Sequence, residues 1–221
     1  MDVAFQLRDL VEAIINGEAE AAVVIAHSLL QQDIPCESII ENGLTEALRF
    51  LDTKCTNEEF NLLEIMLAGR AMVSVLDEVI APRLLFNPPL SSNKTIVIGT
   101  IKGDIHDLGK QIVRTLFRAR GFRVIDIGKD IEPVDFVRVA IIEGASYIGV
   151  SSLLTLNIPF IREIKRILRN EGVNNIKVIA GGAAIQQARP EDLDVDYIAK
   201  DAFDALHYLD KDLKECHPLI E

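Results

Sequence analysis

Residues 95–110 read TIVIGTIKGDIHDLGK, and this stretch decides the fold. Thr95 to Gly99 form a short β-branched run that is typical of a buried strand, and an amphipathic helix is predicted to begin near Leu108. Further short runs follow, each separated from the next by a helical pattern. This alternation of strands and helices predicts a parallel sheet with helices packed on its faces.

The other strands of this sheet are expected at Arg123–Ile127, Tyr147–Ser151, Lys177–Ala180 and Asp196–Ile198. The helices are expected at about Leu108–Arg120, Pro133–Glu143, Ile158–Asn170 and Ala202–Glu215, with a short helical turn near Ala184–Gln187. Five such units predict a flavodoxin-like, doubly wound α/β sheet. Ligands of these folds bind beyond the carboxyl ends of the strands, where the strand order reverses. The loops after the first, third and fourth strands are therefore the expected site.

The chain from Val3 to about Phe86 has a different pattern, because its apolar residues recur every three or four positions without alternation. Four helices in a small bundle are predicted, with breaks at Asn16-Gly17, at Asp33-Ile34-Pro35, and from Asp52 to Asn57 before a helix that contains Leu62 to Val79. The segment NPPLSSN at 87–93 breaks the periodicity. We predict a helical cap domain over residues 1–89 and a second domain over residues 94–221.

Composition limits the partners and the compartment. The chain has 221 residues, a net charge of −11 and a pI near 4.9, so its field opposes nucleic acids and anionic membranes. The three cysteines are far apart in sequence and lack metal-site spacing, which favours a reducing cytoplasm. The N-terminal segment has neither a basic region nor a long apolar run. We expect a cytoplasmic protein with no nucleic-acid or membrane partner.

The loop after the first strand holds His106 between a buried strand and the next helix. A metal-binding imidazole presents one neutral nitrogen, while a carboxylate or carbonyl group usually holds the other ring N–H. Asp104, two residues earlier, is a candidate for that carboxylate. Gly103 relaxes the turn, and Gly109 lacks a Cβ where a bulky ligand would approach the backbone. A histidine in a loop is more often a surface residue, so this pattern needs support from the other loops.

The two other loops supply that support. The third strand runs into Ser151, Leu153 and Thr155, which mix hydroxyl groups with apolar side chains, and the fourth strand ends in Gly181-Gly182. Such loops suit a large flat heterocycle that lies against bare backbone. Alternatively, Ser151 and Thr155 could cap the helix near Ile158, and the two glycines could form an ordinary turn.

Taken together, Asp104-x-His106-x-x-Gly109, Ser151-x-Leu153 and Gly181-Gly182 resemble the motifs of the cobalamin-binding domain family, in the same order and after the expected strands. The longer string from Lys102 to Lys110 is similar to the corresponding segment of methionine synthase and of small methyltransferase corrinoid proteins. The helical half resembles the cap module that precedes the corrinoid domain in those proteins, so the resemblance covers almost the whole chain.

The resemblance implies that the chain binds cobalamin or a related corrinoid in the base-off, histidine-on form. His106 would ligate cobalt, Asp104 would hydrogen-bond His106, and Ser151 would match the serine of the relay or of the nucleotide-tail contact. The implied cofactor-binding set is Gly103, Asp104, Ile105, His106, Asp107, Gly109, Ser151, Leu153, Thr155, Gly181, Gly182, Asp201 and Ala202, with Asn61, Leu62 and Met66 at the cap. Asn61 lies where relatives usually carry an apolar residue.

The implied function is that of a carrier subunit that is not itself catalytic. The chain would move a methyl group on cobalt from a substrate-specific methyltransferase to a second corrinoid-dependent methyltransferase that acts on tetrahydrofolate or a thiol, with a reductive activator as a further partner. The alternative is a cobalamin-dependent sensor or regulator. The small subunit of an adenosylcobalamin mutase is disfavoured by the helical cap. A receiver domain is disfavoured because the chain lacks its acidic pocket.

Overall fold

The computed structural model describes residues 3–56, 62–85, 94–186 and 188–216. The chain divides into two compact units, Met1–Pro88 and Pro89–Glu221. The first unit is helical, and the second contains the sheet. Each unit has its own buried apolar residues, so each is described by itself.

The helical unit contains α1 (Val3–Ile15) and α2 (Ala19–Gln31), followed by two longer helical segments. The first of these joins α3 (Cys36–Ile39), a π-helical turn (Ile40–Thr45) and α4 (Glu46–Thr56), and the second joins α5 (Leu62–Val75), a π-helical turn (Leu76–Ile80) and α6 (Ala81–Leu85). Helix α1 packs against α2, α4 and α5. Buried residues at helical spacing, such as Leu10, Ala13 and Ile14 of α1, form the interior. These segments form the predicted cap with its four helical segments.

One predicted break is wrong. We expected the chain to leave the helix from Asp52 to Asn57, but α4 continues through Thr56. The polar residues of this stretch do not break the helix, because threonine, lysine and aspartate reduce helix propensity only slightly when neither glycine nor proline is present. The side-chain hydroxyl of Thr53 donates to the Arg49 carbonyl oxygen at 2.9 Å, which places it on the helix surface.

The second unit is a five-stranded parallel sheet in the order β2-β1-β3-β4-β5. The strands are β1 (Thr95–Thr100), β2 (Arg123–Asp126), β3 (Tyr147–Ser151), β4 (Lys177–Gly181) and β5 (Tyr197–Ala199). Every residue of β1 is buried, as a central parallel strand requires. This is the predicted flavodoxin-like order, and the direction of winding reverses between β1 and β3.

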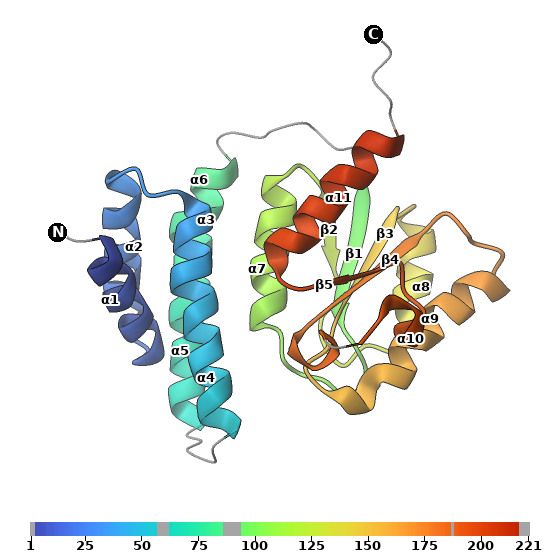
Figure 1. The fold of residues 1–221 in the computed structure, drawn as a ribbon, viewed down its shortest axis with the longest axis horizontal. Coiled ribbons are helices and arrows are strands. Elements are labelled where there is room, and N and C mark those ends of the chain that lie inside the picture. The colour runs from blue at the N-terminus through green and yellow to red at the C-terminus, as the bar shows by residue number, and fades with distance from the viewer. Residues whose placement is uncertain (1–2, 57–61, 86–93, 187, 217–221) are drawn as a thin grey trace, which may run out of the picture. The chain divides into compact units, whose positions relative to one another are not determined.

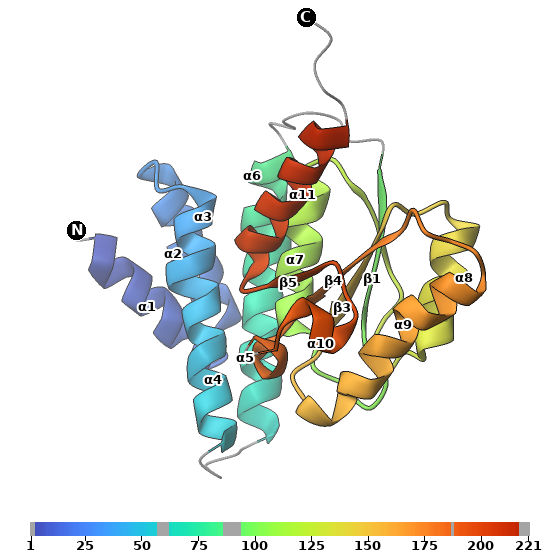
Figure 2. The ribbon, with the colours of Figure 1, turned by 45° about the vertical axis from the view of Figure 1, so that its right-hand side comes forward.

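Helices cover both faces of this sheet (Figures 1 and 2). One face carries α7 (Leu108–Ala119) and α11 (Ala202–Cys216), which contact each other. The other face carries α8 (Pro133–Ile142) and α9 (Ile158–Asn170), which also contact each other. The apolar clusters beneath them centre on Phe117 and Leu209 on the first face and on Phe136 and Ile164 on the second.

The bounds agree with the predicted ones to within one or two residues, and α9 matches at both ends. The short helix α10 (Pro190–Leu193) was not predicted, although Pro190 at its first position is a helix-start signal. The expected turn near Ala184–Gln187 is a 3-10 turn at Ala183–Ile185. In the described segments, no helix has the length and apolar content that crossing a membrane requires.

Candidate functional site

The carboxyl ends of four neighbouring strands lie in one row. The parallel register pairs Thr100 of β1 with Ser151 of β3, Ser151 with Gly181 of β4, and Gly181 with Ala199 of β5. The three sequence motifs begin at this row or directly after it. The fold therefore brings the loops of His106, Ser151 and Gly181 to one edge of the sheet, on both sides of the point where the strand order reverses.

Asp104 is the buried centre of this edge. It is 0% exposed, and both of its oxygens accept hydrogen bonds. Oδ1 accepts one from the backbone amide of His106 at 2.9 Å and lies 2.7 Å from Nδ1 of the His106 ring. Oδ2 accepts one from the backbone amide of Leu153 at 2.6 Å. A buried carboxylate with these partners is satisfied, and it ties the loop after β1 to the loop after β3.

His106 points away from the interior, since its side chain is 55% exposed. A carboxylate is an acceptor, so Asp104 selects the tautomer with the proton on Nδ1, which leaves the lone pair of the neutral ring on Nε2. An imidazole fixed in this way is a ready metal ligand. The hydrogen bond between Asp104 and His106 that the resemblance implied is present.

The loop that carries His106 has further anchors. The hydroxyl of Thr100 donates to the carbonyl oxygen of His106 at 3.0 Å, and the amide of Gly103 donates to Asp130 Oδ1 at 2.8 Å. The amide of Asp130 in turn donates to the carbonyl oxygen of Asp104 at 3.0 Å. Gly103 has a φ of +80°, a conformation that favours glycine. The backbone on both sides of His106 is therefore held.

The serine expected in the relay has a different place. The donor recorded at Asp104 Oδ2 is the Leu153 amide, and half-buried Ser151 ends β3 beside Gly181. The next residue, Ser152, is 0% exposed, and its hydroxyl donates to the Leu154 carbonyl oxygen at 3.1 Å. In this structure a backbone amide rather than the Ser151 hydroxyl donates to Asp104 Oδ2, and no side-chain bond caps α9 at Asn157.

The glycines of the candidate site differ in whether the protein's own packing requires them. Gly182 has a φ of +126°, and a Cβ built there would lie 2.0 Å from the carbonyl oxygen of Ser152, so close packing of the two loops requires glycine. A Cβ at Gly109 would meet nothing within 4 Å, and one at Gly181 would meet only the Ala199 carbonyl oxygen at 3.9 Å. The protein's own packing does not require glycine at either position. Their open space fits a bulky group that lies against the backbone.

A buried amide also lacks a partner at this edge. Asn157 is 4% exposed, and its Nδ2 is the only buried side-chain nitrogen or oxygen in the described residues that has no hydrogen bond. A Cβ built at Gly103 would lie 3.2 Å from Asn157 Oδ1, so the amide faces the turn that precedes Asp104. A buried donor without an acceptor is costly unless something else satisfies it. A bulky cofactor with hydrogen-bond acceptors would fit the open space at Gly109 and Gly181 and would satisfy the Asn157 donor.

Exposed apolar side chains lie in the two loops that Asp104 ties together. Ile105 is 67% exposed, Leu154 is 38% exposed and Leu156 is 85% exposed. Leu154 and Leu156 were not among the expected site residues. They could have been found from the sequence, because two leucines in the loop that follows a buried strand at the carboxyl edge are unusual for a solvated turn. Exposed apolar groups in the loops that hold a candidate metal-binding histidine suit the face of a flat macrocycle.

The remaining expected residues lie in various places. Asp107 and Leu153 are partly buried, and Thr155 is exposed at the start of a 3-10 turn (Thr155–Asn157). Asp201 Oδ1 accepts bonds from the amides of Phe203 and Asp204, so it caps α11, where Ala202 is the first residue. Asn61 and the side chain of Leu62 lie outside the described residues, and Met66 is 64% exposed on α5.

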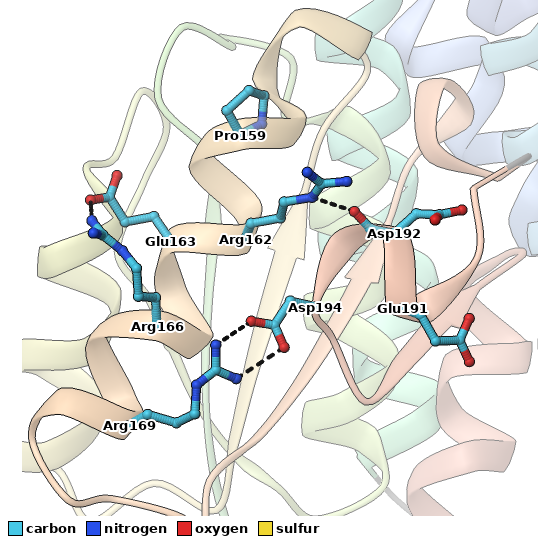
Figure 3. Close-up of a pocket in the computed structure, with 8 residues that line it drawn as sticks. All are labelled: Pro159, Arg162, Glu163, Arg166, Arg169, Glu191, Asp192 and Asp194. Atoms are coloured by element: carbon cyan, nitrogen blue, oxygen red, sulfur yellow. Dashed lines mark hydrogen bonds and ion pairs between the residues drawn. The ribbon is translucent and has the colours of Figure 1, made fainter.

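A separate hollow lies between α9 and α10 (Figure 3). Arg169 binds both carboxylate oxygens of Asp194, at 3.0 and 2.5 Å, and this pairing lowers the pKa of Asp194 below its usual range. Arg162 donates to the carbonyl oxygen of Asp192, and Arg166 pairs with Glu163. These charged groups are partnered within the chain, so the hollow is explained by the attachment of α10 to α9.

Comparison with known proteins identifies the family. Models of the B12 binding domain match residues 94–207 and residues 6–80, which correspond to the sheet unit and the helical unit. The chain belongs to the B12-binding corrinoid proteins. It is 31% identical over 209 residues to a corrinoid protein of Desulfitobacterium hafniense, with 93% of this chain and 96% of that protein covered.

Two more relatives support this assignment. Dimethylamine corrinoid protein 1 of Methanosarcina mazei is 33% identical to this chain over 201 residues, which cover 90% of this chain and 92% of that protein. The structure of the Methanosarcina barkeri monomethylamine corrinoid protein matches with a TM-score of 0.78 and 27% identity over 91% of this chain and 95% of that one. The family resemblance and the fold predicted from the sequence are confirmed, and the cofactor class is a B12-type corrinoid.

Proposed function

We propose that this chain carries a methyl group on the cobalt of a corrinoid between two methyltransferases, with the corrinoid bound base-off and His106 as the lower axial ligand. The single observation that carries the proposal is the position of the His106 ring. Its Nδ1 lies 2.7 Å from a fully buried carboxylate, while the ring itself is exposed at the carboxyl edge of the sheet. A histidine that serves only as a surface residue has no need of a buried carboxylate beneath it.

Different groups of residues would have different roles in binding the corrinoid. Asp104 holds the His106 tautomer and raises the basicity of Nε2, which strengthens a bond to a metal. Ile105, Leu154 and Leu156 supply apolar contacts for the underside of a macrocycle. The proposed nucleotide-tail groove is formed by the backbone at the open glycines Gly109 and Gly181, with Gly103, Asp107, Ser151, Leu153, Thr155 and Gly182 around it.

The other expected contacts are part of the same proposal. Asp201 and Ala202 follow β5 and would border the corrinoid. Asn61, Leu62 and Met66 of the helical unit would contact its reactive face, and these three assignments remain predictions. Exposure of Met66 is compatible with such a contact.

When bound, the corrinoid supplies a cobalt that accepts and releases a methyl group. The chain's own residues would hold the cobalt through His106, and the chemistry on the methyl donor and acceptor would belong to partner enzymes. We propose a substrate-specific methyltransferase, a second methyltransferase acting on tetrahydrofolate or a thiol, and a reductive activator, all within one-carbon metabolism in the cytoplasm. The names of the relatives favour a methylated amine as the donor.

Reconstitution tests the proposal. The purified protein is incubated with hydroxocobalamin and desalted, and the red colour should stay with the protein in a ratio near one to one. His106→Ala should retain part of the corrinoid through the tail groove. The methyltransferase that co-purifies with the tagged protein from cell extract should then transfer a methyl group to it from a methylated amine. A protein that retains no corrinoid after desalting would refute the proposal.

A further inference from the structure

A buried ion pair between Lys110 and Asp126 lies next to the candidate site. Lys110 is in the first turn of α7, four residues after His106, and its side chain is 3% exposed. Its Nζ donates to Oδ1 of Asp126, the last residue of β2, whose side chain is 14% exposed. Arg114 Nη1 is the next nearest cation, at 3.9 Å from Asp126 Oδ2.

A buried ion pair of this kind is not explained by stability alone. Removing two charges from water costs more than their attraction returns in many proteins, and an apolar pair of similar size is often at least as stable. What an ion pair adds over an apolar contact is a fixed arrangement of the elements that carry its two ends. Lys110 and Asp126 would in this way fix α7 relative to the loop after β2.

Asp126 extends the contact into the following loop. The same Oδ1 atom that binds Lys110 accepts a hydrogen bond from the amide of Gly128 at 3.0 Å. Gly128 has a φ of +98°, and its carbonyl oxygen accepts a bond from the amide of Thr100 at 2.9 Å. The carboxylate thus holds the turn that packs on the end of β1.

The loop after β2 is also bonded to the loop that carries His106. Asp130 Oδ1 accepts from the Gly103 amide, and the Asp130 amide donates to the Asp104 carbonyl oxygen. The amide of Ile131 donates to the Thr100 carbonyl oxygen at 3.0 Å. One ion pair therefore links the helix that follows His106 to the loop that supports the residues before it.

We infer that the Lys110–Asp126 ion pair positions the loop of His106. It fixes this loop at α7, which follows His106, and at the loop 128–131, which supports the residues before His106, so that the imidazole keeps one position at the sheet edge. Lys110 does not touch the ligand; it acts through Asp126 and the loop 128–131. Ligation of cobalt by this imidazole rests on the proposed function, whereas the fixing of the loop is independent of it.

The first test uses the protein without cofactor. Amide hydrogen exchange is measured for residues 102–107 in the wild type and in Lys110→Met. Exchange in this segment should rise about tenfold or more in the variant, because the loop opens locally without global unfolding. Exchange in residues 102–107 that stays at the wild-type rate in folded Lys110→Met would overturn the inference.

A matched control separates positioning from the general loss of an ion pair. Lys165 Nζ lies 2.7 Å from Asp196, whose Oδ2 likewise accepts a backbone bond, from Val178 at 2.6 Å. Lys165→Met should leave exchange in residues 102–107 unchanged. If Lys110→Met does not fold, the double variant Lys110→Met/Asp126→Leu removes both charges and should fold, yet its loop should still exchange faster. A double variant with wild-type exchange in the loop would also overturn the inference.

The second test uses protein reconstituted with hydroxocobalamin and reduced to Co(II). The share of molecules with nitrogen hyperfine splitting from histidine should fall at least about threefold in Lys110→Met, while corrinoid remains bound. Lys165→Met should keep the wild-type share. An unchanged share in Lys110→Met would contradict the inference. If the wild type binds no corrinoid, the proposed function fails, and the exchange experiment still decides whether Lys110 positions the loop.

Discussion

The backbone amide of Leu153 donates a hydrogen bond of 2.6 Å to Asp104 Oδ2, and the two residues are 49 positions apart in the chain. The bond connects the loops after β1 and β3, the two strands between which the sheet changes its direction of winding. The other oxygen of the same carboxylate faces the His106 ring. One buried side chain, Asp104, therefore joins the two loops at this edge of the sheet and orients the ring of His106, the candidate metal ligand.

This arrangement predicts the effect of Asp104→Asn. The amide has the shape of the carboxylate, but its NH₂ group must face a donor, either the Leu153 amide or the amide and ring of His106. We expect the free energy of unfolding to fall by about 1–3 kcal/mol, and histidine ligation of cobalt to weaken. Urea denaturation measures the first effect and Co(II) EPR measures the second.

Asp130→Asn is the matched control for that substitution. Asp130 accepts one backbone bond through Oδ1 in an exposed position, and asparagine keeps an oxygen for it. Its free energy of unfolding should change by no more than about 0.5 kcal/mol. Equal losses in both variants would show that the buried position of Asp104 has no special role.

Two substitutions at Gly109 separate the stability of the helix from corrinoid binding. Gly109 is the second residue of α7, and a Cβ there meets nothing within 4 Å. Gly109→Ala should raise the free energy of unfolding by up to about 1 kcal/mol, because alanine favours the helix. Gly109→Leu should fold as well as the wild type but bind hydroxocobalamin at least about tenfold more weakly, since its side chain fills the proposed groove. Equilibrium dialysis measures the affinity, and full binding by Gly109→Leu would remove Gly109 from the groove.

Gly182 should behave differently from Gly109. A Cβ at this position meets the Ser152 carbonyl oxygen at 2.0 Å, and its φ is +126°. Gly182→Ala should therefore destabilise the fold by about 3 kcal/mol or more, through backbone strain and a clash between the loops after β3 and β4. Thermal unfolding without cofactor is the measurement. A melting temperature like that of the wild type would mean that the loops after β3 and β4 do not pack as described.

Tyr197 predicts a loss of stability at alkaline pH. Burial raises its pKa from 10.0 to about 12, and the hydrogen bond from its hydroxyl to Asp204 at 2.8 Å adds to the shift. The folded state holds the phenol proton more tightly than the unfolded chain does. This contribution is therefore complete below about pH 10 and is lost as the pH rises towards about 12. Between about pH 9 and about pH 11, urea midpoints should fall less in Tyr197→Phe than in the wild type; equal falls would contradict the assignment.

The sequence predicted the sheet well because its central strands are buried on both faces and read as short apolar runs, as in Thr95–Thr100 and Tyr147–Ser151. The flavodoxin-like, doubly wound sheet followed from the regular alternation of strands and helices. The end of α4 was missed because residues 52–56 have weak helix propensity but contain no residue that stops a helix. Helix α10 was missed because a single helical turn has no measurable periodicity.

The candidate site was predicted in part. His106 and Asp104 are two residues apart, so their contact could be inferred from local sequence. The bond from the Leu153 amide could not, because backbone donors have no sequence pattern and their partners depend on how two loops meet. The same holds for the link from Lys110 through Asp126 to Gly128, which joins α7 to the end of β2, two segments that only the fold brings together. The sequence shows that apolar residues follow the third strand, but it does not predict that Leu154 and Leu156 are exposed.

Ligation of cobalt by His106 is tested by Co(II) EPR of the protein reconstituted with hydroxocobalamin, with ¹⁵N placed only in the histidine side chains. We expect nitrogen hyperfine splitting whose pattern changes from that of ¹⁴N to that of ¹⁵N, and which disappears in His106→Ala while corrinoid remains bound. Splitting that ignores the histidine label, or that persists in His106→Ala, would contradict ligation by His106.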